Sequence, residues 1–325
     1  MADEKNEQVA GESGVIDFNI EAVRLGDHIV RGTAADGQVR AFAITARTSV
    51  QELHDRHQTS PVVSAALGRL LMAGMMMGAM SKNDDELITL VVHGDGPVGG
   101  LTVTANNRGQ AKGFANHPHV WLPLNSAGKH SVAEAVAGEN HVGTLAVIHD
   151  LPGMEPYSSK VPLVSGEIGD DLAAYFLLSD QIPTSVGVGV LVNGDTSIRQ
   201  AGGFIIQLMP GYDDELVDEL EAALSGVSSV TDLLEQGLDP AGILRTLLAD
   251  FDFQELEVAP VEFHCSCDHE RASRAVLALG REEIEDMIAK NETAEAHCHF
   301  CGRVHYLTPD ELCALLERTI HSEED

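Results

Sequence analysis

The chain has 325 residues, of which 44% are hydrophobic, so it is long enough for two or three domains with at least one substantial core. Its formal net charge of −31 and its lack of basic runs argue against nucleic-acid or anionic-membrane partners, because those surfaces bind clusters of lysine and arginine. The sequence starts with polar and acidic residues, and its longest apolar stretch, residues 70–80, is too short to cross a bilayer, so we expect a cytoplasmic protein.

The first part of the chain predicts an N-terminal α+β domain over residues 15–210, preceded by a disordered extension over residues 1–14. Residues 21–46 alternate apolar and polar positions around glycine-containing turns, which predicts paired strands. Residues 60–82 predict a helix that starts at Ser60–Pro61 and is apolar on all sides, so we expect it to be buried. Its methionines could instead form an adaptable binding surface, but the all-round hydrophobicity favours a core helix; they are Met72, Met75, Met76, Met77 and Met80.

The rest of this domain predicts a mostly antiparallel sheet. Strand patterns recur within residues 85–115 and again over 143–151, and a helix is expected from residue 169 to just before Pro183. Four valines alternate over residues 185–192, and a turn at Asn193–Gly194 should lead into a partner strand that begins at Ala201. Gly187 and Gly189 belong to no phosphate-binding motif, so we interpret them as strand glycines.

Residues 211–259 predict an acidic helical linker. Thirteen acidic residues and one base, Arg245, fall between Tyr212 and Val258. Three short amphipathic helices are expected there, with N-caps at Asp213, Ser229 (or Thr231) and Asp239. Because so many like charges repel one another, we expect this segment to pack only marginally on its neighbours.

The C-terminal segment, residues 260–325, contains two pairs of cysteines. The first pair has the spacing C-x-C and the second C-x-x-C, followed by Gly302; the four residues are Cys265, Cys267, Cys298 and Cys301. Cytosolic thiols stay reduced, and four thiolates in two tight turns suit one tetrahedral Zn²⁺. A histidine ligand in place of a cysteine is possible but unnecessary, so we expect the nearby histidines to lie around the site or on the surface; they are His264, His269, His297, His299 and His305.

Between and after the cysteine pairs the sequence predicts a small domain that needs the metal for stability. A helix is expected over residues 279–291 and a strand over 304–307. A second helix should follow, with Pro309 at its first position and a capping box from Thr308 to Glu311. The fifth thiol, Cys313, lies in this helix, and we expect it to be half-buried and structural.

Several functions remain open for the cysteine site. Zinc can be purely structural, but each cysteine pair is also spaced to form its own local disulfide, and oxidation of the thiolates would release the metal and remove the support of the acidic linker. A nucleic-acid-binding zinc ribbon is disfavoured by the charge. An enzyme, whether a thiol oxidoreductase or a zinc hydrolase, is disfavoured because a closed four-cysteine site leaves no open coordination position and neither G-x-S-x-G nor H-E-x-x-H occurs.

The same residues resemble the Hsp33 family of redox-regulated bacterial holdase chaperones. The likeness extends from about residue 15 over nearly the whole chain, and is most specific in the C-x-C and C-x-x-C motifs, "YFLLSDQIPT" (175–184), "AGGFIIQLMPG" (201–211) and "GDGP" (94–97). It implies a protein that is inactive when reduced and zinc-loaded, and that is not an enzyme. The polar extension, the acidity and Cys313 depart from the family pattern.

The resemblance also implies how the protein would be activated. Oxidation would form the disulfides Cys265–Cys267 and Cys298–Cys301, and one Zn²⁺ would leave. The linker would then unfold, the protein would form homodimers, and it would hold unfolding clients without ATP. Which clients it binds, through which residues, and which cysteine pair is oxidised first do not follow from the sequence.

Overall fold

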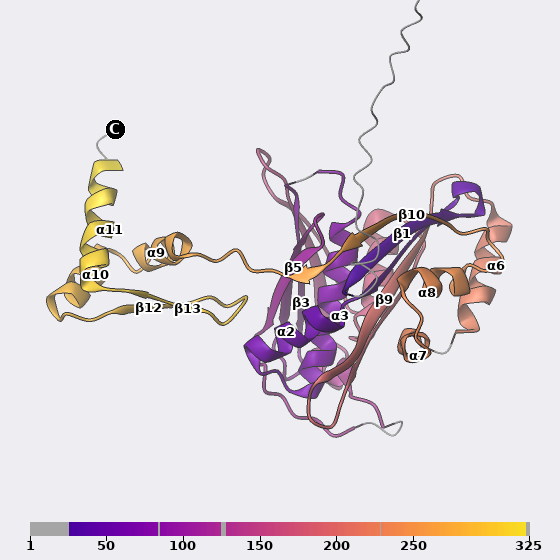
Figure 1. The fold of residues 1–325 in the computed structure, drawn as a ribbon, viewed down its shortest axis with the longest axis horizontal. Coiled ribbons are helices and arrows are strands. Elements are labelled where there is room, and N and C mark those ends of the chain that lie inside the picture. The colour runs from indigo at the N-terminus through magenta and orange to yellow at the C-terminus, as the bar shows by residue number, and fades with distance from the viewer. Residues whose placement is uncertain (1–25, 84, 125–127, 228, 323–325) are drawn as a thin grey trace, which may run out of the picture.

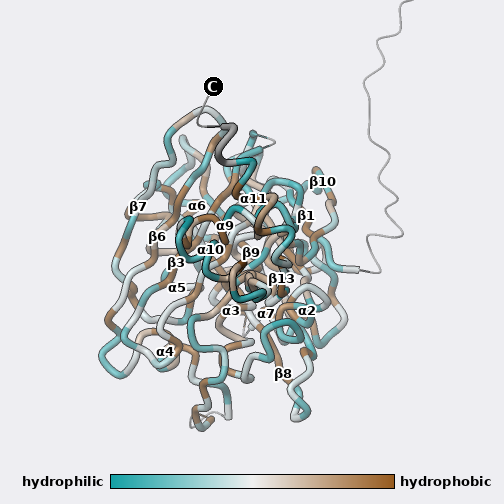
Figure 2. Tube along the Cα trace, turned by 90° about the vertical axis from the view of Figure 1, so that its left-hand side faces the viewer, coloured by the Kyte–Doolittle hydropathy of each residue, from teal (hydrophilic) through white to brown (hydrophobic). Residues whose placement is uncertain are grey.

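The computed structural model describes residues 26–83, 85–124, 128–227 and 229–322. The predicted disorder of residues 1–14 lies outside these ranges. Figure 1 shows a body of two β-sheets and their helices, from which a smaller unit extends at the C-terminal end of the chain. In the perpendicular view this C-terminal unit lies in front of the two sheets (Figure 2). The fold is mixed α+β with mostly antiparallel sheets, as predicted.

The first sheet, sheet A, has five antiparallel strands in the order β10-β1-β2-β9-β8. Their bounds are β1 His28–Ala34, β2 Val39–Thr45, β8 Thr184–Val192, β9 Ile198–Leu208 and β10 Gln254–Pro260. Both faces of this sheet are covered, since Phe42 and Ile44 of β2 belong to the central core whereas Ala41 and Ala43 belong to a second core beneath the linker. The turn between β8 and β9 is longer than the predicted Asn193–Gly194, because Ser197 closes it by accepting a hydrogen bond from the N–H of Asn193.

The second sheet, sheet B, has six strands in the order β11-β5-β4-β3-β6-β7. Their bounds are β3 Leu87–Gly94, β4 Leu101–Asn106, β5 Gln110–Ala115, β6 Gly143–Asp150, β7 Tyr157–Pro162 and β11 Glu262–Phe263. All neighbouring pairs are antiparallel except the two-residue β11, which runs parallel to β5. Because β10 and β11 follow each other directly, one short segment forms the edge of both sheets.

Helix α3 (Pro61–Gly78) forms the centre of the body and contacts strands of both sheets. Pro61 occupies its first turn, where a missing N–H costs nothing. The helix is long and apolar enough to cross a membrane, but 89% of its apolar window is buried inside the protein, which makes it a core helix. Met72, Met75 and Met76 are fully buried, so the prediction that the methionines serve the core is confirmed.

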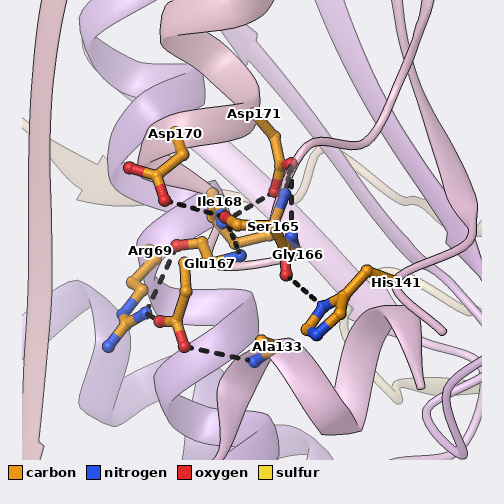
Figure 3. Close-up of polar contacts among 9 residues, drawn as sticks. All are labelled: Arg69, Ala133, His141, Ser165, Gly166, Glu167, Ile168, Asp170 and Asp171. Carbon is orange, nitrogen blue, oxygen red and sulfur yellow. Dashed lines mark hydrogen bonds and ion pairs between the residues drawn. The ribbon is translucent and has the colours of Figure 1, made fainter. Parts of the chain in front are cut away.

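Three further helices complete the body: α2 Arg47–His57, α4 Val132–Ala137 and α5 Gly169–Tyr175. The helix predicted up to Pro183 is shorter as an α-helix, because a π-helical turn (Phe176–Asp180) continues it and Gln181 then adopts a left-handed conformation. The loop before α5 wraps around buried Asp171, whose carboxylate accepts hydrogen bonds from four backbone N–H groups. The donors are Val164 and, as Figure 3 shows, Ser165, Gly166 and Ile168. This loop also carries Glu167, which pairs with Arg69 of α3 at 2.5 Å.

The linker forms the three predicted helices, α6 Asp214–Ser225, α7 Val230–Glu235 and α8 Pro240–Leu247. The side chains of Ser229 and Asp239 cap α7 and α8, whereas Asp213 stands at the N-cap of α6 without a capping hydrogen bond from its side chain. The helices pack on the outer face of sheet A through buried leucine and isoleucine side chains. The predicted helical linker did not include β10, which takes up the last part of residues 211–259.

The C-terminal unit contains three helices and a two-stranded sheet around a small core, to which seven buried apolar side chains belong among those described up to residue 318. Its elements are α9 His269–Leu277, α10 Arg281–Ala289, β12 Ala294–His297, β13 Val304–Leu307 and α11 Pro309–Ser322. The capping box of α11 is present, because Glu311 accepts from the N–H of Thr308 at 2.8 Å. The expectation of a half-buried Cys313 is wrong: Leu312, Leu315 and Leu316 face the core, and Cys313 is exposed on another side of the helix.

Candidate metal centre

The fold brings the four cysteines of the two sequence motifs together. The Sγ atoms of Cys265, Cys267, Cys298 and Cys301 all lie within 4.8 Å of one another. The Sγ–Sγ distance is 3.7 Å between Cys265 and Cys298 and 3.3 Å between Cys267 and Cys301. A tetrahedral ion with metal–sulfur distances near 2.3 Å separates its ligands by about 3.8 Å, so this cluster can hold such an ion with small adjustments.

Two local structures present the sulfurs. Cys265 and Cys267 lie in the extended segment between β11 and α9, and Cys298 and Cys301 lie in the turn between β12 and β13. In that turn the carbonyl of Cys298 accepts from the N–H of Gly302 at 2.8 Å, and Gly302 has a φ of +68°. A side chain at position 302 would be strained in this conformation and would approach the carbonyl oxygen of Arg56 to 3.0 Å, which explains the glycine after the motif.

The thiols differ in their acidity. Burial raises the pKa of Cys265, Cys267 and Cys301. Burial also acts on Cys298, but hydrogen bonds from the Cys301 thiol and from the backbone N–H groups of Phe300 and Cys301 outweigh it and leave the pKa of Cys298 lowered. The turn therefore favours a thiolate at one position even before a metal is considered.

Cationic side chains surround the cluster, although the chain as a whole carries a net charge of −31. Arg271 donates to the hydroxyl of Ser266 at 2.7 Å, and Arg303 donates to the carbonyl of Cys267 at 3.3 Å. A pocket of about 210 Å³ beside the sulfurs is lined by Lys112 and Arg271 among others. Four thiolates on a divalent ion leave two negative charges, which such neighbours stabilise.

The cluster is attached to the body through β11 and through the turn that carries Phe300. The Phe300 ring meets the Phe114 ring edge-on at 5.2 Å and lies 4.8 Å from the Nζ of Lys112. His57 of α2 places its Nε2 3.1 Å from the carbonyl oxygen of Phe300. Burial lowers the pKa of His57, so its neutral form, which donates through one ring nitrogen, makes this contact.

The histidines of the C-terminal segment do not join the cluster. Among the described residues the metal-competent group consists of the four cysteines alone. His269 and His297 pair with glutamates on the surface, at 3.4 Å and 3.6 Å. His297 and His305 both line the pocket beside the sulfurs. The Nε2 of His305 is buried and lacks a hydrogen-bond partner among the described residues, so it can contact a group in this pocket.

Comparisons with known proteins agree with this architecture. The family model for the Hsp33 protein matches residues 27–308. The chain belongs to the Hsp33 family. The 33 kDa chaperonins of Agathobacter rectalis and Geobacillus kaustophilus are both 48% identical to it over 288 residues, which cover 89% of this chain and 99% and 97% of those proteins. The crystal structure of the 33 kDa chaperonin from Thermotoga maritima is similar with a TM-score of 0.82 and 32% identity, over 91% of this chain and 99% of that one.

Membership of the Hsp33 family makes this chain a member of a chaperone family and not of an enzyme family. The sequence predicted the cysteine cluster, because both motifs are short and local. It did not predict the roles of Phe300 and His57 at the junction, since their partners lie about 190 and 240 residues away in sequence. The assignment of the cysteines as zinc ligands and redox pairs stays a prediction.

Proposed function

We propose that this Hsp33 family member is an ATP-independent holdase chaperone that is switched on by oxidation. In the reduced protein Cys265, Cys267, Cys298 and Cys301 would bind one Zn²⁺, and the linker would cover sheet A. Oxidation would convert the thiolates to two disulfides, free the metal and release the linker. The freed apolar surface would hold unfolding proteins and prevent their aggregation.

The observation that supports this proposal is the direct connection from the cysteine cluster to the linker. Cys265 follows β11 by one residue, and His264 between them donates its N–H to the carbonyl of Ala111 in β5 at 2.8 Å. β10 precedes β11 and pairs with β1, and helices α6 to α8 precede β10. A change at the sulfurs therefore acts first on β11 and β10, the strands that anchor the end of the linker.

The surface beneath the linker has the composition of a client-binding face. Sheet A presents buried valine, alanine, phenylalanine, isoleucine and leucine side chains to the linker helices. The linker contributes a matching set, in which Ile243 and Leu244 are completely buried. Loss of α6 to α8 would expose this continuous apolar area, and large exposed apolar patches bind other apolar chains.

The redox chemistry balances with peroxide as the oxidant. Four thiolates, two molecules of hydrogen peroxide and four protons give two disulfides and four molecules of water, so each disulfide removes two electrons from sulfur. When bound, zinc would keep the four sulfurs ionised and tie the two halves of the C-terminal unit together. Disulfide sulfurs are poor ligands, so oxidation withdraws the donor set.

The pairing of the cysteines decides whether the unit opens. The proposed local pairs, Cys265–Cys267 and Cys298–Cys301, leave the two halves free to separate. The cross pairs that are close in the structure, Cys265–Cys298 and Cys267–Cys301, would instead join the halves covalently. We expect tryptic peptides of the active, oxidised protein to contain the local pairs; recovery of cross-linked peptides would contradict the opening mechanism.

Further parts of the proposal concern partners and location. Unfolding proteins are the proposed partners, the oxidised form is a homodimer, and the protein acts in the cytoplasm. The charge of −31 offers no support for binding nucleic acid or anionic membranes.

Protection of a heat-denaturing enzyme from aggregation tests the proposal. Light scattering would be recorded with the reduced, zinc-loaded protein and with protein treated with peroxide at elevated temperature, and bound zinc and free thiols would be counted in both. We expect protection only after oxidation, together with loss of zinc and of four thiols. Equal protection in both states with zinc retained would assign the cluster a purely structural role.

A further inference from the structure

Strand β8 leaves an open, uncharged edge on sheet A. Of the other edge strands of sheets A and B, β10 and β11 carry glutamates and β7 carries Lys160 and ends at Pro162, and such residues discourage further strand pairing. β8 reads TSVGVGVLV and has neither a charge nor a proline. Proteins rarely leave a strand of nine residues in this state unless something binds it.

The outward backbone groups of β8 belong to its even-numbered residues. The carbonyl oxygen of Gly187 points toward β9. A Cβ atom placed on Gly203 of β9 would lie only 2.7 Å from this oxygen. N–H and C=O groups alternate in direction along an antiparallel strand, so those of Val188 and Val190 point away from β9. Within the described residues no hydrogen bond to these outward groups is found. The start of α5 covers the neighbouring group, the carbonyl of Val186.

A groove of about 660 Å³ runs along this open part of the edge. β8 forms one wall from Val188 to Val192, and the segment Val120–Leu124 contributes the other. Helix α3 lies along the groove from Pro61 to Arg69, and the start of α7 also borders it. Strand spacing, sheet thickness and rise per residue give roughly 160 Å³ per residue of a packed strand. The groove therefore accommodates about four residues of a single extended chain, which is too little for the edge of a second folded copy with its own neighbouring strands.

The groove suits an uncharged occupant. Arg69 at its margin is already paired with Glu167, as Figure 3 shows. Burial, and then the nearby charge of Arg69, lower the pKa of His130, so this imidazole is neutral at pH 7. Lys129 also lines the groove and is itself engaged in another interaction, and the start of α7 adds the hydroxyls of Ser229 and Thr231. The remaining walls are largely valine, leucine and glycine, with Trp121 of the facing segment 70% exposed.

We propose that β8 and the segment 120–124 form a docking groove for one extended, uncharged and apolar segment of an unfolding protein, which adds to sheet A as a sixth strand. The outward N–H and C=O groups of Val188 and Val190 bind its backbone, so recognition is independent of a particular sequence. The identity of the occupant as a client rests on the holdase function proposed above. The groove is formed with the linker folded, so it can bind a short segment before oxidation, whereas protection of a whole client would still require the surface that oxidation frees.

Trp121 provides the measurement, because it is the only tryptophan of the chain. The probe is a blocked peptide of alternating valine and threonine with one lysine at each end, added to the reduced full-length protein. We expect a saturable blue shift of the Trp121 emission and protection of Trp121 from acrylamide quenching. The same peptide with N-methyl groups on alternate residues keeps its side chains but loses one pairing edge, and should bind about tenfold more weakly or worse.

A matched pair of variants tests the protein side. Val188→Pro removes one outward N–H and leaves the ladder to β9 intact, whereas Val188→Thr keeps the N–H; we expect only the proline variant to lose peptide binding. Should Val188→Pro fail to fold, the comparison of the two peptides on the unchanged protein decides. Equal shifts with both peptides, no shift with either, or a shift that depends on protein concentration without peptide would overturn the proposal.

The outcome is separable from that of the holdase proposal. Aggregation protection after oxidation with no peptide binding at β8 would overturn the groove and leave the holdase function standing. Peptide binding without any protection after oxidation would overturn the holdase function and leave the groove as a peptide site.

Discussion

At the scale of single residues, buried polar groups hold the loops in place. Asp171 accepts four backbone N–H groups in the turn before α5, and one of these donors, Ile168, has a φ of +68° that a branched side chain rarely adopts. His57 makes the corresponding contact at the junction with the C-terminal unit. In both places one side chain binds backbone groups that lie elsewhere in the sequence, and at Ile168 it holds a conformation that local sequence preference does not favour.

Replacement of Asp171 by asparagine should destabilise the body. An amide has one acceptor oxygen and turns its NH₂ group toward a donor, so we expect a loss of about 2–4 kcal/mol in the free energy of unfolding. Urea denaturation of the reduced protein measures it. Asp170→Asn is the matched control, because Asp170 bonds only to the exposed hydroxyl of Ser165 in Figure 3 and should cost less than about 0.5 kcal/mol. Similar losses for both variants would contradict this account.

Attachment of the C-terminal unit should weaken as the pH falls. The pKa of His57 in the folded protein lies below its ordinary value of 6.5, chiefly because of burial. The detached state therefore binds a proton at a higher pH than the attached state, so the contribution of His57 is complete above pH 6.5 and is lost below it. Hydrogen exchange at β5 and β11 should report the detachment. His57→Gln removes this pH dependence while leaving that of the cysteines, and an unchanged profile in the variant would exclude His57.

At the scale of elements, the linker helices depend on packing and not on their own charges. Glu215 and Glu219 are one turn apart in α6, a like-charge spacing that destabilises a helix. What holds the linker is the burial of its apolar side chains against sheet A, together with the ion pairs Arg199–Glu235 and Arg245–Glu255.

Truncation of one linker side chain should therefore activate the protein without oxidation. Leu244 is fully buried, and Leu244→Ala should remove about 2–4 kcal/mol from the packing of the linker. We expect protease cleavage between residues 212 and 258 and partial protection of a denaturing client while zinc stays bound. Leu256→Ala is the control, since Leu256 is 63% exposed. If Leu244→Ala protected the client only after it had lost zinc, release of the linker would not be the step that exposes the client-binding surface.

The elements that the sequence predicted are those whose signals lie within the element itself, and those it missed depend on contacts with residues far away in the sequence. Helix α3, the β8–β9 pair, the three linker helices and both cysteine motifs follow from apolar periodicity, caps and turns within the segment itself. β10 pairs with β1 across more than 200 residues, and its sequence QELEVAP carries little of the apolar alternation that marks a strand. Helix α9 was also missed, because HERASRAVL has few large apolar residues and is fixed by packing within the C-terminal unit.

At the scale of the whole molecule, the charge of −31 opposes the compact state. Its density is highest in the linker, the part that is proposed to unfold. Salt shortens the range of this repulsion from about 10 Å at 0.1 M to about 3 Å at 1 M. Ionic strength should therefore change the stability of the linker helices more strongly than that of the two-sheet body.

We expect linker release after oxidation to be slower in high potassium chloride than in low. The measurement is the rate of protease cleavage between residues 212 and 258 at fixed peroxide, from about 0.05 M to about 1 M salt. A variant with Asp218→Asn, Glu219→Gln and Glu221→Gln should show a smaller salt effect, because its linker repels itself less. A salt effect of the same size in this variant would show that repulsion among these three side chains does not cause it.

The position of β10 and β11 has a consequence for how the protein is made. A chain that is still emerging from the ribosome has its first 253 residues, with β1 to β9 and the linker helices, before either strand exists. The edges of β1 and β5 then remain open until the last quarter of the polypeptide has been translated. A chain truncated after residue 253 would lack both strands, so the edges of β1 and β5 would stay unpaired. Such a fragment would tend to associate through these edges whatever the redox state of the cell.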